Sequence, residues 1–208
     1  MVLDYRYENN YPGVIAGIDE AGRGPWAGPV VAAAVILDKE QLPDGINDSK
    51  KLTKTGREYL YDIIVARAHI GVGICSVIEI DEHNILGATK IAMRRAYDAL
   101  PIKPNIALID GNQLPDLPCA MEAVVDGDAL CVSIAAASII AKVTRDRIMV
   151  ELSEEFQGYG WDRNAGYGTR SHQDGLDRLG ITPHHRRSFA PIRKLIEKLD
   201  EPKKRELY

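Results

Sequence analysis

Short apolar runs rich in β-branched residues and alanine alternate along this chain with longer stretches of helical periodicity. The short runs predict strands at residues 14–18, 29–37, 70–78, 105–110 and 121–125. Only a glycine-rich turn separates the first two, so they are expected to pair as an antiparallel hairpin. A dinucleotide-binding glycine loop would lead into a helix, whereas here Pro29 and another β-type run follow.

The longer stretches carry apolar residues at helical spacing and predict helices. They cover residues 54–68, 81–100, 132–155, 171–179 and 191–199. Thr53 stands where an N-cap is expected, and the small residues between 133 and 143 would let that helix pack closely on a sheet. The order of elements predicts an α/β fold, a mixed five-stranded sheet flanked by helices with a small C-terminal helical cap.

Composition narrows the class of protein. The chain has 208 residues, of which 45% are hydrophobic, enough for one substantial core. The N-terminus lacks the pattern of a signal peptide, and the apolar stretch at 131–143 is too short and too polar to span a bilayer. We therefore expect a cytoplasmic protein with no membrane partner. Three scattered cysteines, Cys75, Cys119 and Cys131, argue against disulfides and zinc and are expected in the core.

Charge is divided unevenly along the chain. The formal net charge is −4, which argues against binding of nucleic acid through bulk positive charge. Residues 1–132 carry 19 acidic and 12 basic residues, whereas residues 133–208 carry 11 acidic and 14 basic ones. The first part is therefore suited to holding cations, and the second to following a polyanion.

Carboxylates stand at the ends of predicted strands. Asp19 and Glu20 end the first strand, Asp110 ends the fourth, and Asp128 follows the fifth. If strands one and four are parallel neighbours, their carboxylates emerge at the same edge of the sheet. Asp110 capping a turn, or Asp128 capping a helix, is the alternative for each residue taken alone.

Four carboxylates at one edge would repel one another unless cations neutralised them. Ligands that are all oxygen favour Mg²⁺ or Mn²⁺ over zinc, and two such ions about 4 Å apart support phosphodiester hydrolysis. The turn after Glu20 adds Gly22, Arg23 and Gly24, which combine a closely approachable backbone with a planar guanidinium suited to phosphate or sugar oxygens.

Six motifs in order resemble those of the ribonuclease HII family, over residues 14–199. They are GIDEAGRGP (17–25), DSKKL (48–52), LIDG (108–111), SIAAASIIAKVTRDR (133–147), GYGT with a following histidine (166–172) and HRRSF (185–189). Members of this family cut RNA within RNA–DNA hybrids and next to ribonucleotides embedded in duplex DNA. The resemblance implies a ribonuclease H-like fold and hydrolysis with two ions, Mg²⁺ or Mn²⁺, that leaves 3′-hydroxyl and 5′-phosphate ends.

The resemblance also implies roles for particular residues. Asp19, Glu20, Asp110 and Asp128 become the catalytic and metal-binding set. Gly22, Arg23 and Gly24 are expected to read the ribose 2′-hydroxyl, and Tyr167 to stack on the sugar where RNA passes into DNA. Residues 1–13 form an N-terminal extension, residues 14–155 the catalytic core, and residues 156–208 a helical region that completes the substrate groove within one compact unit.

Other polar residues are assigned less directly. Lys50 and Lys51 either contact phosphates or belong to a solvated loop. Lys142 is a further candidate for substrate contact, and Asp146, four residues later, is more readily its ion-pair partner than an outer-sphere metal ligand.

Two more candidates come from the C-terminal motifs. His172 either contacts substrate or packs within its loop. Arg186, in the basic turn 184–187, is expected to line the groove.

The chain departs from the family close to the chemistry. Many members have Lys-Gly-Asp where this chain has Asp126, Gly127 and Asp128. The added acid would either raise metal affinity or weaken contact with phosphate, and the spacing to SIAAAS favours Asp128 over Asp126 as the fourth ligand.

Two other functions compete with this hypothesis. One is a non-catalytic module that binds RNA–DNA hybrids, although four acids facing a polyanion would weaken such binding without metal. The other is ribonuclease HIII, against which the tyrosine of GYGT argues. A monomer is expected, and the C-terminal tail is either a docking segment or disordered.

Overall fold

The computed structural model describes residues 3–200, and the C-terminal tail after residue 200 lies outside them. Five strands form one mixed sheet in the order β3-β2-β1-β4-β5. Their bounds are β1 Ile15–Ala21, β2 Val30–Ile36, β3 His69–Cys75, β4 Ile106–Asp110 and β5 Ala120–Val124. β1 pairs antiparallel with β2 and parallel with β4, which confirms the predicted hairpin and the predicted mixed sheet.

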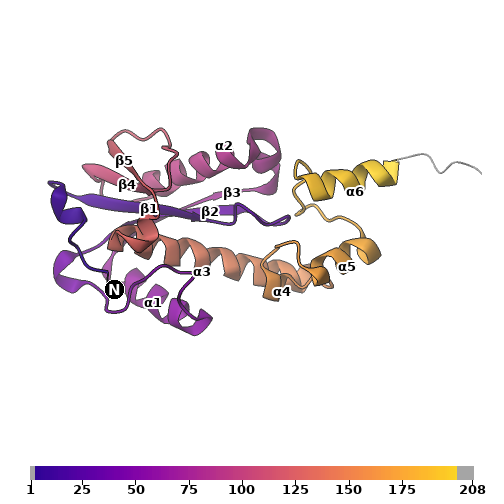
Figure 1. The fold of residues 1–208 in the computed structure, drawn as a ribbon, viewed down its shortest axis with the longest axis horizontal. Coiled ribbons are helices and arrows are strands. Elements are labelled where there is room, and N and C mark those ends of the chain that lie inside the picture. The colour runs from indigo at the N-terminus through magenta and orange to yellow at the C-terminus, as the bar shows by residue number, and fades with distance from the viewer. Residues whose placement is uncertain (1–2, 201–208) are drawn as a thin grey trace, which may run out of the picture.

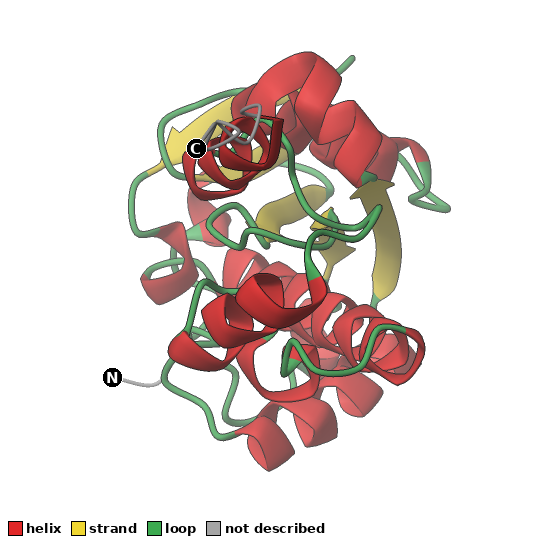
Figure 2. Cartoon of the chain, turned by 90° about the vertical axis from the view of Figure 1, so that its right-hand side faces the viewer, coloured by secondary structure: helices red, strands yellow, loops and turns green. Residues whose placement is uncertain are grey.

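Helices cover both faces of the sheet. They are α1 Lys54–Arg67, α2 Val77–Asp98, α3 Val132–Glu155, α4 Trp161–Asn164, α5 Arg170–Leu179 and α6 Ala190–Asp200. α2 lies on one face, α3 on the other with α1 beside it, and α4 to α6 gather at one end of the molecule (Figure 1). Figure 2, a view from that end, shows the strands between the two helical layers. None of the helices within residues 3–200 has the length and apolar character needed to cross a membrane.

Small residues bring the helices close to the sheet. A Cβ added to Gly17 of β1 would collide with the α3 backbone at Ser133 and Ile134. A Cβ added to Gly71 or Gly73 of β3 would collide with carbonyls of α2. The sheet is therefore in close contact with both helical layers, and two large buried apolar clusters, one with α2 and one with α3 and α1, lie on its opposite faces.

The boundary between β3 and α2 differs from the prediction. The apolar run 70–78 indicates one strand, but β3 ends at Cys75 and α2 begins at Val77. Ser76 is the reason: its hydroxyl accepts the Glu79 N–H, and the Glu79 carboxylate accepts the Ser76 N–H. This capping box starts the helix within the apolar run.

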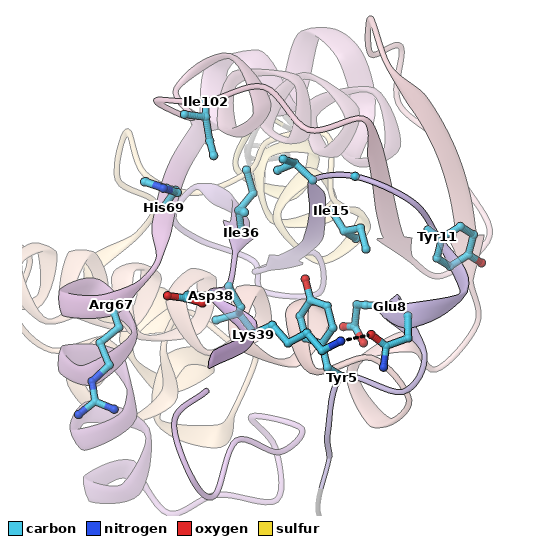
Figure 3. Close-up of a pocket in the computed structure, with 14 residues that line it drawn as sticks. Tyr5, Glu8, Tyr11, Ile15, Ile36, Asp38, Lys39, Arg67, His69 and Ile102 are labelled. Atoms are coloured by element: carbon cyan, nitrogen blue, oxygen red, sulfur yellow. Dashed lines mark hydrogen bonds between the residues drawn. The ribbon is translucent and has the colours of Figure 1, made fainter. Parts of the chain in front are cut away.

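The N-terminal segment packs on the start of α3. Glu8 is fully buried, and its Oε1 accepts hydrogen bonds from the N–H and the hydroxyl of Ser133, at 2.8 and 2.7 Å. Beside Glu8, a cavity of about 530 Å³ opens between this segment, the end of β2 and the start of β3 (Figure 3). The cavity lies at the start of β1, at the end of the sheet opposite Asp19 and Glu20.

Candidate active site

Parallel pairing of β1 with β4 brings two distant carboxylates together. Ile18 is the register partner of Ile109, so Asp19 and Asp110 leave adjacent strands at the same edge. Glu20 follows Asp19, and Asp128 reaches the same edge from a 3-10 turn, Gly127–Ala129, after β5. We call Asp19, Glu20, Asp110 and Asp128 the carboxylate row.

Burial and mutual repulsion act on the carboxylate row. Asp19 is only 5% exposed, and its pKa is raised well above the usual value by burial, then by the charges of Glu20 and Asp110. Burial also raises the pKa of Glu20, although Arg23 opposes the shift by donating a 3.1 Å hydrogen bond. The pKa of Asp110 is raised by burial and by Asp128. The row is therefore a site of concentrated negative charge.

Asp128, and not Asp126, belongs to this row. Asp128 is buried, and its Oδ2 lies 3.0 Å from the Lys50 ammonium. Asp126 is exposed and has a left-handed backbone at φ 54°. The helix-capping alternative does not describe Asp128, because α3 begins after Cys131 and no side chain caps it. Asp110 does bond a turn, since its Oδ1 accepts the Gly127 N–H at 2.8 Å.

The donors of the row are all oxygens, the set that hard divalent ions prefer. Within residues 3–200, no three Asp, Glu, His or Cys side chains converge closely enough to hold one ion in the present arrangement. Two of the four carboxylates instead bind cationic side chains, Glu20 to Arg23 and Asp128 to Lys50. The oxygen ligands of the row are therefore suited to a divalent cation. In this structure Arg23 and Lys50 neutralise part of its negative charge.

A turn held by buried arginines forms the next wall of the site. We call residues 22–29 the glycine turn. Arg186, which is fully buried, donates hydrogen bonds to the carbonyls of Gly22, Arg23, Gly28 and Pro29. Arg145, which is 1% exposed, donates to the carbonyls of Ala27, Pro29 and Ala165.

These contacts change the expectation for Arg186. Its guanidinium is enclosed by backbone oxygens and does not line an open groove, so it supports the glycine turn from beneath. Burial lowers the pKa of Arg186 to about 9 and that of Arg145 to about 10. With their carbonyls turned toward the two arginines, the peptide groups of the turn are held in one conformation.

Two glycines of this wall lie against buried or aromatic side chains, and at Gly22 glycine is required for steric reasons. Gly22 has φ 97°, and a Cβ there would collide with the Arg145 side chain. A Cβ on Gly24 would be 3.4 Å from Cε1 of Tyr167, so the tyrosine ring lies directly beside the turn. Tyr167 is 47% exposed and lines a cavity beside the carboxylate row.

His172 lies behind Tyr167 and away from solvent. Its Nδ1 bonds the Tyr167 carbonyl at 3.0 Å, and its Nε2 lies 3.0 Å from Nε2 of His185. Trp161 donates to the same Nε2 at 3.2 Å. Because His172 is fully buried, the packing interpretation describes it, and the expected substrate contact does not.

The cavity beside the row has a volume of about 240 Å³. Its lining includes the expected Asp19, Glu20, Asp110, Lys50, Lys142 and Tyr167. Lys142 pairs with Asp146 at 2.7 Å, which confirms the ion-pair interpretation of Asp146. Lys51 points elsewhere, 3.8 Å from Asp48.

Sequence reasoning missed three polar residues of this lining. They are Ser49, Ser138 and Arg145. Ser49 and Ser138 join two of the motifs through a 2.6 Å hydrogen bond between their hydroxyls. All three lie inside motifs that the sequence displays, so motif membership was the available signal.

A five-stranded mixed sheet with a carboxylate row at one edge, beside a glycine turn and an exposed tyrosine, defines a nuclease of the ribonuclease H fold. The family model described as Ribonuclease HII matches residues 16–192. The chain therefore belongs to the ribonuclease HII family and is an endoribonuclease that hydrolyses RNA in RNA–DNA hybrids. This confirms the resemblance and disfavours both the non-catalytic module and ribonuclease HIII.

Individual relatives agree with this assignment. Ribonuclease HII of Ruegeria pomeroyi is 57% identical over 183 residues, covering 88% of this chain and 78% of that protein. The protein from Paramagnetospirillum magneticum is 56% identical over 193 residues, covering 91% and 96%. Among solved structures, ribonuclease H2 from Pyrococcus horikoshii OT3 has a TM-score of 0.78 at 28% identity, covering 91% of this chain and 100% of that one. A Bst-RNase HIII structure, with a TM-score of 0.72 at 20% identity over 91% and 71%, shares the fold.

Proposed function

We propose that Asp19, Glu20, Asp110 and Asp128 hold two divalent ions and that this site hydrolyses the phosphodiester. The observation that carries the proposal is the burial of Asp19 beside three other carboxylates, whose repulsion a divalent cation would relieve. When bound, such ions supply an activated water and stabilise the departing oxygen, leaving 3′-hydroxyl and 5′-phosphate ends. A Bst-RNase HIII structure of the same fold is a complex with Mn²⁺, so Mn²⁺ and Mg²⁺ are the ions to compare.

The glycine turn and Tyr167 are proposed to select the ribonucleotide. Arg145 and Arg186 bind the carbonyls of the turn, so its conformation is set before substrate arrives. The 2′-hydroxyl is the group that distinguishes RNA from DNA, and the half-exposed ring of Tyr167 offers a flat apolar surface to the adjoining sugar. This arrangement supports incision at a single ribonucleotide in duplex DNA as well as cleavage of hybrids.

Lysines on both sides of the cavity are proposed to contact phosphates. Lys50 and Lys142 line it directly, and Lys51 extends from the same loop as Lys50.

His172 and Arg186 take the supporting roles that their burial suggests. The helical region after residue 155 supplies both of these residues and Tyr167, which supports its assignment as the part that completes the groove.

The enzyme is proposed to act as a monomer on duplex nucleic acid. A ribonuclease HII from Archaeoglobus fulgidus, with a TM-score of 0.71 at 29% identity, was solved as a complex with PCNA. PCNA is accordingly a candidate protein partner to test for this chain.

Substitution of the carboxylates tests the catalytic assignment. Asp110→Asn is expected to lower turnover on a duplex with one ribonucleotide by at least roughly a thousandfold, because metal-assisted hydrolysis contributes several kcal/mol. Folding and hybrid binding should be retained. Asp126→Asn is the matched control, since Asp126 is exposed and asparagine tolerates its left-handed backbone, and it should keep turnover within a few-fold. Retained turnover in Asp110→Asn would overturn the assignment.

A further inference from the structure

A second cavity lies against the carboxylate row on the side of α2. Its volume is about 50 Å³, and it shares Glu20, Arg23 and Asp110 with the larger active-site cavity. The remaining wall residues come from α2 and from the turn after β4, and those that matter here are Thr89, Lys90, Met93, Gly111, Asn112 and Gln113. The Arg23–Glu20 ion pair thus separates two spaces at one sheet edge.

Lys90 brings a positive charge to this cavity that has no ion-pair partner in the part of the chain that the structure describes. Two nearby basic residues of α2 are paired: Arg94 with Asp98 at 2.9 Å, and Arg95 with Glu79 at 2.6 Å. Within residues 3–200, the Lys90 ammonium has neither an ion pair nor a hydrogen bond, although its side chain is partly buried. The carboxylate of Glu20, which also lines this cavity, is paired with Arg23 at 3.1 Å.

The turn after β4 adds uncharged donors. In the part of the chain that the structure describes, neither the backbone N–H nor the side-chain amide of Asn112 and of Gln113 has an acceptor. Gly111 has φ 86°, and a Cβ built there would meet nothing within 4 Å, so the space beside the turn is open. The hydroxyl of Thr89 already donates to the Ile85 carbonyl, so it is not among the donors available to a ligand.

The walls of the cavity are fixed in place. The Gly111 N–H donates to the Val124 carbonyl at 2.9 Å, which ties the start of the turn to β5. Arg94 donates to the Asp116 carbonyl at 3.2 Å, which ties the same turn to α2. The backbone of the turn that carries Asn112 and Gln113 is therefore tied to β5 at one end and to α2 at the other.

We propose that Lys90, together with the amides of Asn112 and Gln113, binds a backbone phosphate of the nucleic acid, one other than the phosphate that reacts. A group with several acceptor oxygens and one negative charge matches one ammonium and a set of neutral N–H donors. The Lys90 ammonium can only donate and would repel a metal ion. The inference rests on the proposed function of the carboxylate row, and it places a phosphate contact on the side of that row opposite Lys50 and Lys142.

The test combines a protein variant with altered substrates. Duplexes carrying one ribonucleotide are prepared with a single phosphate replaced by a neutral methylphosphonate, one position at a time. For the wild type, kcat/KM should fall by roughly tenfold at the contacted position, the effect of one charge-assisted hydrogen bond. Lys90→Gln should lose a similar factor on the natural duplex, through KM, and should then be insensitive to methylphosphonate at that one position.

The position that couples to Lys90 identifies the source of the phosphate. If the effects of Lys90→Gln and methylphosphonate are non-additive at a position on the ribonucleotide-containing strand, Lys90 contacts the strand that is cleaved. If they are non-additive at a position on the complementary strand, Lys90 contacts that strand. Lys90→Arg keeps the positive charge and should therefore remain sensitive to methylphosphonate at that position. Lys39→Gln is the control, since it removes the same charge at the opposite end of the sheet, and it should change neither kcat/KM nor the methylphosphonate pattern.

The proposal would be overturned if the effects of Lys90→Gln and of the methylphosphonate were additive at every position. It would also be overturned if Lys90→Gln and Lys39→Gln had equal effects. Failure of the catalytic assignment is read separately, because it would show as turnover by Asp110→Asn. A thermal unfolding curve for Lys90→Gln that matches the wild type ensures that a loss in KM reports binding and not instability.

Discussion

The ammonium of Lys50 lies 3.0 Å from Oδ2 of Asp128, although the two residues are 78 positions apart. The Lys50 side chain is 79% exposed, whereas that of Asp128 is 8% exposed. The hydrogen bond to Asp128 raises the pKa of Lys50, so the lysine is firmly cationic at neutral pH. An exposed cation thus neutralises one end of the carboxylate row, where a metal ion would compete with it.

Lys50→Gln should therefore bind Mn²⁺ more tightly in the absence of nucleic acid. An exposed ion pair is worth up to about 1 kcal/mol, so affinity should rise by up to about fivefold, as measured by calorimetric titration. Incision should nevertheless slow, because Lys50 is also proposed to contact phosphate. Lys51→Gln, which removes a charge facing Asp48, should leave Mn²⁺ affinity unchanged. Weaker Mn²⁺ binding by Lys50→Gln would contradict this competition.

Tyr167→Ala should impair incision at a lone ribonucleotide more than cleavage of a continuous hybrid. The ring lies beside Gly24, and stacking of an aromatic side chain on a nucleotide contributes about 1–3 kcal/mol, or roughly 5- to 150-fold. Tyr167→Phe keeps the ring and should retain most of the preference. The measurement is the ratio of kcat/KM on the two substrates, and equal losses on both would argue against a role in junction recognition.

Arg186→Lys should loosen the glycine turn. Lysine cannot donate to four carbonyls at once, and each buried carbonyl left without a donor costs about 1–3 kcal/mol. We expect a lower melting temperature and, well below it, a loss of discrimination between a ribonucleotide and a deoxynucleotide at the cut site. Arg187→Lys is the adjacent control, because the Arg187 side chain is exposed. Unchanged discrimination in folded Arg186→Lys would mean that the arginine supports stability alone.

The buried histidine pair should make the enzyme sensitive to mild acid. Burial, and then the neighbouring His172, lowers the pKa of His185 to about 3, and burial lowers that of His172 as well. Below the unfolded value near 6.5, the unfolded chain binds more protons than the folded one, so the free energy of unfolding falls as pH falls. The slope is at most about 1.4 kcal/mol per pH unit for each histidine.

Urea unfolding of the wild type and His185→Gln between pH 7.5 and 5.5 measures this contribution. The raised pKa of Asp19 acts in the opposite direction, so the histidine effect is the difference in slope between the two proteins. The variant should be less stable at pH 7.5 but should lose less stability on acidification. Parallel slopes would show that His185 does not titrate in this range.

Local sequence determined much of the fold. The apolar runs around Ile18 and Ile109 predict strands that end at carboxylates; Asp110 is indeed the last residue of β4, whereas β1 continues through Asp19 and Glu20 to Ala21. The helix over 132–155 was predicted with its observed bounds, because its small apolar residues continue for several turns. Where two local signals overlapped, as at Ser76 within the run 70–78, the capping box decided the boundary and the apolar pattern misled.

Local patterns along the chain were enough to locate the strands and helices, the carboxylates near the ends of strands, and the motifs of the family. The enclosure of His172 and Arg186, the contact between Lys50 and Asp128, and the position of Lys90 at a cavity beside the row became visible only in the folded molecule. The two sets of features differ because the interactions behind them differ in range. Periodicity and capping act within a few residues along the chain, whereas burial and hydrogen bonding of Arg186 depend on carbonyls more than 150 residues away.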